Sequence, residues 1–123
     1  MKSPNRPHQL FVLDACPKDT RITLRLSLNQ WNDIKGHCDK LGIQQNQFIR
    51  FSIISKLESS NPFSFKKAAY KYTDEVLENP RSITINNELK NLIYEILTKT
   101  EWDLQSYARL AIAERLTLRD RLL

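Results

Sequence analysis

The chain has 123 residues, which is enough for one small domain with a single core. Its formal net charge of +5 favours polyanionic partners without requiring one, and its two glycines are too few for a glycine-rich phosphate loop. No window approaches the ~20 apolar residues of a membrane span, and prolines stand where a signal peptide needs an apolar run. We therefore expect a soluble, cytoplasmic protein that contacts no membrane.

Residues 1–20 precede the first regular pattern and form an N-terminal arm. Its first segment, "MKSPNRPHQ", is either disordered or lies along a groove or backbone of DNA, as some basic arms do.

A strict alternation of apolar and polar residues follows over residues 21–28, which predicts a half-buried strand. The apolar side of this strand consists of Ile22, Leu24, Leu26 and Leu28, and the polar side of Arg21, Thr23, Arg25 and Ser27. The strand would therefore expose arginine and hydroxyl groups.

The apolar spacing then changes to three and four residues, which predicts a helix that Ser27 caps and Gly42 ends. A second helix lies within "IQQNQFIRFSIISKLESS", and its apolar positions cover more than one stripe, so we expect it at the centre of the fold. Those positions are Phe48, Ile49, Phe51, Ile53, Ile54 and Leu57.

Residues 59–79 form a linker between two asparagine-proline pairs. Its apolar residues keep a helical spacing, which predicts one extra helix, broken near Thr73 and packed on the flank of the core. About twenty extended residues span ~65 Å, which is far more than the width of so small a domain.

The chain repeats itself after a shift of 59 positions, without a gap. Ile34 then falls on Ile93 and Arg50 on Arg109, while the helix caps Ser27 and Gln44 fall on Asn86 and Asp103; the further matched pairs are Cys38 with Leu97, Phe48 with Tyr107, Ile53 with Ile112 and Leu57 with Leu116. Residues 21–58 and 80–123 are therefore two strand-helix-helix units, the second with a short tail. Neither unit can bury its own apolar face, but two together can.

The segments "RITLRLS" and "DKLGIQQNQFIRF", with their weaker echoes "RSITINN" and "TEWDLQSYARL", resemble the ribbon-helix-helix DNA-binding proteins, such as the Arc, Met and CopG repressors. The resemblance covers about residues 21–58 and 80–118 and is closer in the first unit. It implies a mainly α fold with a two-stranded antiparallel β-ribbon, built as a tandem pseudo-dimer in which one chain supplies both units.

In that family the outward side chains of the ribbon enter the major groove of double-stranded DNA. The resemblance therefore implies that Arg21, Thr23 and Arg25 contact bases, with Ser82 and Thr84 as the counterparts on the second strand. Pro80 aligns with Arg21 and offers no arginine, so the ribbon would be lopsided.

Phosphate contacts are expected at the start of the second helix of the first unit, where Gln44, Gln45 and Asn46 expose backbone N–H groups at the positive end of the helix dipole. In the second unit Asp103 would cap the helix itself and repel a phosphate. Among nearby basic residues, Lys18 and Lys40 are the candidates for added electrostatic attraction.

The sequence thus predicts a sequence-specific DNA-binding protein associated with the nucleoid, acting as a transcriptional repressor. Two other functions stay open: an accessory protein of a conjugative relaxosome, and an antitoxin-like interaction module that no longer reads DNA. Apolar positions in the last segment, "AIAERLTLRDRLL", could serve a protein partner or a second copy of the chain, and copies of the chain could also stack on longer DNA sites.

We expect neither an enzyme nor a cofactor. The acidic residues lie on predicted exposed helix faces with no partner base, and the histidines and cysteines show no metal-ligand spacing; Cys16 and Cys38 are expected as free thiols. The aromatic residues Trp31, Trp102, Tyr94 and Tyr107 are expected in core or interface packing, and Arg50 and Arg109 in structural contacts to carboxylates or carbonyls of the other unit.

Overall fold

The computed structural model describes residues 19–118, so the predictions for the arm, including Lys18 and Cys16, lie outside the described residues. Within this range the protein is mainly helical, with one two-stranded antiparallel sheet. The elements in chain order are β1 (Asp19–Leu24), α2 (Leu28–Leu41), α3 (Gln45–Leu57), the 3₁₀ helix η2 (Lys67–Tyr70), β2 (Arg81–Asn86), α4 (Asn87–Thr98) and α5 (Leu104–Thr117).

The strands β1 and β2 come from opposite halves of the chain and pair along their whole length. Thr23 lies opposite Ser82, and Ile22 lies opposite Ile83. Because facing residues of an antiparallel pair point to the same side, one face of the ribbon is aliphatic and the other is polar. The aliphatic face is buried, with Ile22, Ile83 and Ile85 each at most 4% exposed.

The regular pairing ends after Leu24, and the chain continues into an irregular crossing. Farther on, Ser27 pairs with Leu77, and the Glu78 N–H donates to the Leu26 carbonyl at 2.8 Å. Residues 25–26 therefore face residues 78–80, which gives a bulge at the place where Pro80 lacks an N–H to donate. The alternation predicted a strand as far as residue 28, but β1 ends at Leu24. Leu28 is exposed as the first residue of α2 and is not buried with Leu26.

Local signals place both ends of α2 as predicted. The Ser27 hydroxyl accepts from the Gln30 N–H, and Gly42 adopts the left-handed conformation (φ 71°), from which its own N–H donates to the Cys38 carbonyl. The chain then turns at once into α3, whose N-cap residue Gln44 makes no side-chain hydrogen bond.

In the second half of the chain, the helices α4 and α5 also begin at N-cap residues. Asn86 caps α4 by accepting from the N–H groups of Glu88 and Leu89, and Asp103 caps α5 by accepting from that of Ser106. Both caps stand at the positions that the shift of 59 residues predicts.

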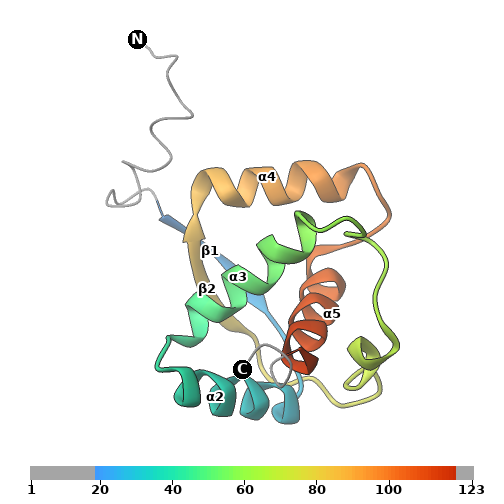
Figure 1. Cartoon of the computed structure of the whole chain (residues 1–123). Coiled ribbons are helices and arrows are strands. Elements are labelled where there is room, and N and C mark those ends of the chain that lie inside the picture. The colour runs from blue at the N-terminus through green and yellow to red at the C-terminus, as the bar shows by residue number, and fades with distance from the viewer. Residues whose placement is uncertain (1–18, 119–123) are drawn as a thin grey trace.

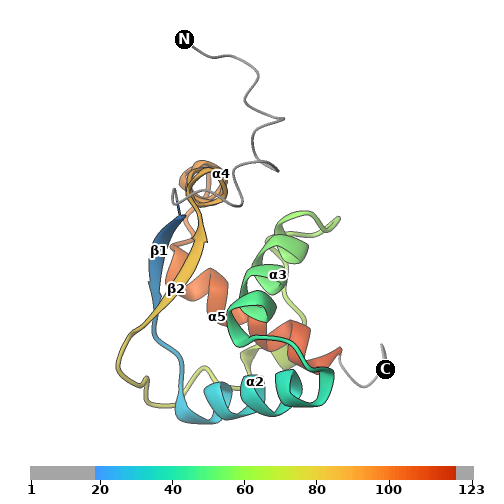
Figure 2. The same ribbon diagram turned by 90° about the vertical axis from the view of Figure 1, so that its left-hand side faces the viewer.

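The helices α2 and α4 lie at opposite ends of the ribbon, and α3 and α5 cross between them (Figure 1). Figure 2 shows α3 and α5 on the same side of the ribbon, against its aliphatic face. Ile49, Tyr107 and Ile112 of these two helices have no exposed surface, which confirms that α3 lies at the centre of the fold and shows that α5 lies there with it.

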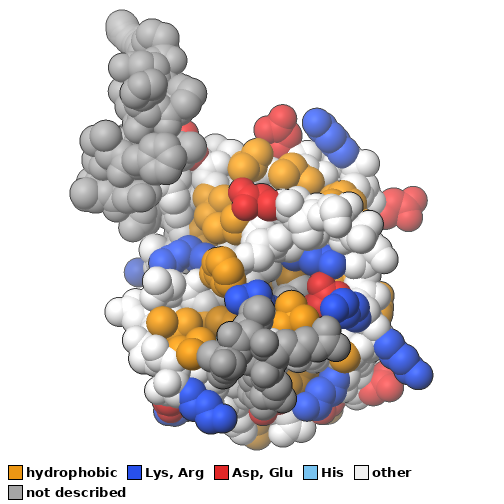
Figure 3. Space-filling model, in the orientation of Figure 1, with side chains coloured by type: hydrophobic (Ala, Val, Ile, Leu, Met, Phe, Trp, Pro, Cys, Tyr) orange, Lys and Arg blue, Asp and Glu red, His pale blue; other side chains and the backbone are white. Residues whose placement is uncertain are grey.

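Phe51, which was expected among the buried positions of its helix, is exposed, and Tyr94, which was expected in core or interface packing, is not in the core. Phe51 is 48% exposed on α3, where the Arg115 guanidinium covers its ring at 4.7 Å, and Tyr94 is 41% exposed on α4. Both lie on the outer side of their helices, because a helix at the surface of a small domain buries only one stripe. On the face seen in Figure 3, hydrophobic side chains are interrupted by charged ones.

The last helix also differs from expectation. Its apolar residues in "AIAERL" were candidates for an exposed partner surface, but Ala111, Ile112, Ala113 and Leu116 are all buried. The linker packs along α5 and removes this face from solvent.

The linker contains only the four-residue helix η2 instead of a long broken helix. It is held by two central side chains: the Lys56 ammonium lies 2.8 Å from the Glu114 carboxylate, with both side chains 11% exposed. Lys56 also donates to the Ser64 carbonyl, and Glu114 accepts from the Lys66 N–H at 2.7 Å. Irregular backbone needs such partners when it packs on a core.

Replacing Glu114 by alanine should destabilise the fold by about 3 kcal/mol, because it leaves the Lys56 ammonium buried without its counter-charge. Urea unfolding at neutral pH measures this loss. The double variant Lys56→Met, Glu114→Leu should recover only part of it, since no buried charge remains but the Ser64 carbonyl and the Lys66 N–H lose their partners. The matched control is Asp39→Ala, which breaks the exposed Lys35–Asp39 pair; a loss at Glu114 no greater than at Asp39 would contradict the expectation.

Candidate nucleic-acid interface

The polar face of the ribbon carries two cross-strand pairs, Arg21 opposite Thr84 and Thr23 opposite Ser82. Arg21, Thr23 and Ser82 are exposed, and Thr84 is half-buried. In Figure 2 this face points away from the helices. The structure therefore brings four of the five predicted base-contacting residues together on one surface, which no other helix or strand of residues 20–118 covers.

Among residues 20–118, Arg21 has no hydrogen-bond or ion-pair partner. Its guanidinium group is held only by its own flexible side chain, next to the hydroxyl-bearing Thr84 on the facing strand. A guanidinium presents a planar fork of N–H donors that suits paired acceptors, so Arg21 is the residue of this face best placed to bind another molecule.

Arg25 is exposed too, but its side chain is already engaged. Its Nε donates to the Glu78 carbonyl at 3.1 Å, and its Nη2 lies 3.5 Å from the Leu77 carbonyl. These contacts turn Arg25 toward the linker at the bulge, where the regular ladder has ended. Sequence alternation alone placed Arg25 beside Arg21, because it could not reveal where pairing stops.

Gln105, in the first turn of α5, holds the end of β1 in place. Its side-chain oxygen accepts from the Arg25 N–H at 3.1 Å, and its side-chain nitrogen donates to the Thr23 carbonyl. These two bonds tie backbone groups at the end of β1 to α5, so the polar face is supported from behind by the second half of the chain.

A polar groove runs between the start of α3 and the start of β2. Gln44, Gln45 and Asn46 line one side of it, and Arg81 and Ser82 line the other. The first backbone N–H groups of α3 have no intrahelical acceptor, and Gln44 does not cap them. Ser82 belongs to both surfaces, so the groove continues into the polar face of the ribbon.

Arg81 lines the groove but was not among the site residues predicted from the sequence. It aligns with buried Ile22, and an alternation model therefore counts it as an inward residue. It is the first residue of β2, where its guanidinium reaches past the edge of the core and stacks 4.2 Å from the centre of the Trp31 ring. The sequence did hold a signal for Arg81: a charged residue aligns there with the buried Ile22 of the first strand, which indicates that the second strand differs at this position.

The start of α5 differs from that of α3. Partial burial acts to raise the pKa of Asp103, but hydrogen bonds from Ser106 and the nearby Arg109 guanidinium outweigh it and hold this pKa below its usual value. An ionised Asp103 satisfies the helix terminus and repels anions. The two helix starts are therefore chemically unequal, as the sequence predicts.

The remaining candidates are dispersed. Lys40 is exposed in the last turn of α2, next to Asp39 of the groove. Arg50 donates to the Thr84 carbonyl at 3.0 Å, which confirms its predicted bridge to the other unit. Arg109 instead donates to Ser106 of its own helix at 3.4 Å.

His37 and Cys38 are neighbours in α2 and both are buried, and His37 packs edge-on against Phe48. Burial, and then the charge of Asp39, raise the pKa of the Cys38 thiol. Residues 19–118 contain no group of three or more histidine, cysteine or acidic side chains that could hold a metal ion. Over the same range, no helix has the length and apolar character needed to cross a membrane.

Comparison with known proteins gives no relative: no family model, curated protein or solved structure matches this chain.

Asp103 makes the stability of the protein depend on pH. A lowered folded-state pKa stabilises the protein above the unfolded value of about 3.9, and this contribution is lost as the pH falls through the folded value. Asp103→Asn keeps a capping side chain without a charge. In urea unfolding at pH 7 and pH 3, the wild type should therefore lose more free energy of unfolding between these pH values than Asp103→Asn does. Equal losses would show that the charge contributes nothing.

Proposed function

We propose that this protein binds double-stranded DNA by inserting its two-stranded ribbon into the major groove. The observation that carries the proposal is the polar face of the ribbon: Arg21, Thr23 and Ser82 are exposed there, while the opposite face is the wall of the core. A major groove about 12 Å wide admits a two-stranded ribbon, and the net charge of +5 favours a polyanion.

The strand register supports a tandem ribbon-helix-helix pseudo-dimer. When two units are related by a twofold axis through an antiparallel ribbon, the central residue must face its own counterpart. Thr23 and its counterpart in the repeat, Ser82, face each other. The equally spaced caps of α2 and α4, and of α3 and α5, support the same relation.

Base readout on this ribbon falls mainly to the first strand. Arg21 offers the N–H fork that matches the O6 and N7 acceptors of guanine, and the hydroxyls of Thr23, Ser82 and Thr84 contact bases less selectively. Arg25 is bound to the linker carbonyls and adds positive charge near the ribbon. The ribbon therefore recognises an asymmetric site, with discrimination concentrated under Arg21.

The groove at the start of α3 takes a backbone phosphate. Uncapped N–H groups, the positive end of the helix dipole and the Arg81 guanidinium converge there, and the Asp39 carboxylate that also lines the groove is paired with Lys35. Because Ser82 joins this groove to the ribbon, one duplex can contact both. The corresponding site at α5 is closed by Asp103, so phosphate binding is as unequal as base readout. Occupying a promoter in this way suits a transcriptional repressor.

Arg21→Ala should weaken binding to a duplex selected from a random pool by about 1–3 kcal/mol, whereas Ser82→Ala should cost less. Fluorescence anisotropy at about 50 and 200 mM salt measures both the loss and the expected fall of affinity with salt. Lys99→Ala is the matched control, because it removes one exposed positive charge at the far end of α4. Absence of binding at low salt, or an equal loss for Arg21→Ala and Lys99→Ala, would refute the proposal.

Gln44→Asp should change stability and DNA binding in opposite directions. It gives α3 the type of cap that α5 has, which stabilises the fold by about 0.5–1 kcal/mol, and it places a carboxylate where the phosphate is proposed to bind. Urea unfolding and the same anisotropy titration measure the two effects. Gln44→Asn is the control, since it caps without charge; unchanged affinity of the aspartate variant would remove the phosphate from this groove.

A further inference from the structure

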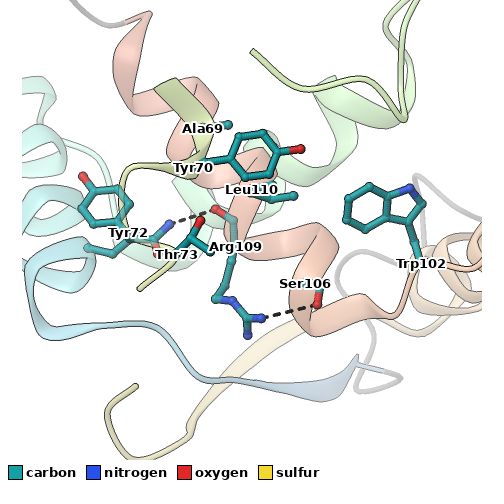
Figure 4. A pocket seen from close by; sticks show the side chains of 9 residues that line it. Ala69, Tyr70, Tyr72, Thr73, Trp102, Ser106, Arg109 and Leu110 are labelled. Atoms are coloured by element: carbon teal, nitrogen blue, oxygen red, sulfur yellow. Dashed lines mark hydrogen bonds between the residues drawn. The ribbon is translucent and has the colours of Figure 1, made fainter. Parts of the chain in front are cut away.

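A cavity of about 250 Å³ lies between η2, α5 and the start of α2 (Figure 4). Drug-sized ligand pockets begin near 300 Å³, so this cavity suits a molecule with one or two rings. It does not include the ribbon residues Arg21, Thr23 or Ser82. The proposed interface with DNA therefore leaves it unexplained.

The walls of the cavity are flat and apolar on two sides. Figure 4 shows the rings of Tyr70 and Trp102 on different sides of the space, with Leu110 next to Tyr70. Tyr70 is 47% exposed although it is a large aromatic residue. Walls of this kind favour a planar aromatic group, whose faces and edges pack against other rings.

Gln30 supplies an unused acceptor inside the protein. Its side chain has no exposed surface, and its Nε2 donates to the Arg109 carbonyl at 3.0 Å. Its Oε1 is buried without a hydrogen-bond partner, and Gln30 is among the residues that line the cavity. A buried polar atom without a partner is costly, so a rotation of the Gln30 amide toward the cavity lets a ligand O–H or N–H donate to Oε1 and form a bond that the free protein lacks.

Arg109 supplies a cation on the cavity wall. Its only hydrogen bond from the guanidinium to a described residue is the 3.4 Å contact with the Ser106 hydroxyl, and no carboxylate in the range 19–118 lies within ion-pair distance. Asp103 acts on it from farther away but is engaged in capping α5. The guanidinium therefore retains N–H donors for a carboxylate.

We propose that this cavity binds a small aromatic carboxylate that carries a hydroxyl or N–H group. The ring lies between Tyr70 and Trp102, the carboxylate binds Arg109 and Ser106, and the donor binds Gln30. The proposal is independent of DNA binding and goes beyond it. Because Ser106 follows Gln105, which braces β1, a bound molecule contacts the same turn of α5 that supports the ribbon.

NMR titration of the full chain without DNA tests the proposal, with 3-hydroxybenzoate, 4-hydroxybenzoate and benzoate as probes. The better hydroxybenzoate should bind saturably with a dissociation constant below about 1 mM, shifting the Trp102 indole N–H and the backbone amides of Arg109 and Leu110. Benzoate should bind several-fold more weakly. The absence of saturable shifts for every probe, or tighter binding of benzoate, would overturn the proposal.

Variants and a neutral probe identify the contacts. Arg109→Gln and Tyr70→Ala should each weaken binding of the better hydroxybenzoate by about tenfold or more. The hydroxybenzyl alcohol with the same ring position should bind the wild type at least tenfold more weakly than that hydroxybenzoate. The comparison of these probes needs no variant and stands even if Arg109→Gln fails to fold. Arg115→Gln is the matched control, since Arg115 stacks on Phe51 outside the cavity. An equal loss for Arg115→Gln, or equal binding of the alcohol, would refute the site.

Discussion

Backbone pairing between β1 and β2 is the constraint on which the arrangement of the protein depends. Within residues 19–118 the sheet has two strands, so each strand pairs with the other alone, and the two come from opposite halves of the chain. Their pairing aligns Ile22 with Ile83 and so closes the core over α3 and α5. The same register leaves Arg21 and Thr23 on the outside, because side chains alternate between the two faces of a strand. One set of backbone bonds thus builds both the core wall and the candidate interface.

The two halves share a plan but not its chemical details. At the bulge, Pro80 lacks the donor that would continue the ladder, and Arg25 turns to the linker carbonyls. At the helix starts, Gln44 leaves the first turn of α3 open whereas Asp103 closes that of α5. The helix starts leave unpaired N–H groups at the start of α3, whereas the bulge occupies the Arg25 side chain, so that Arg21 is the cation of the first strand that stays available. The linker adds a third difference, because it covers α5 and has no counterpart on α3.

Features that depend on neighbouring residues could be predicted from the sequence. Ser27, Gly42, Asn86 and Asp103 end or begin helices through bonds to residues a few positions away, and the repeat spacing identified the elements that would pair. Contacts between distant segments could not be predicted. Arg25 meets Glu78, Lys56 meets Glu114, and Arg81 reaches a groove, and each depends on how whole elements pack. The linker has a helical apolar spacing, yet its backbone follows the partners that α3 and α5 offer.

A covalent connection between the two strands has a consequence for how the molecule behaves on dilution. A ribbon built from two separate chains exists only above the concentration at which those chains associate. Here residues 25–80 tether one strand to the other, so their mutual effective concentration is set by the tether and not by the cell. The ribbon therefore forms within one chain and needs no association between separate chains. Both strands of the ribbon belong to the same polypeptide, which keeps the two unequal halves together in one molecule.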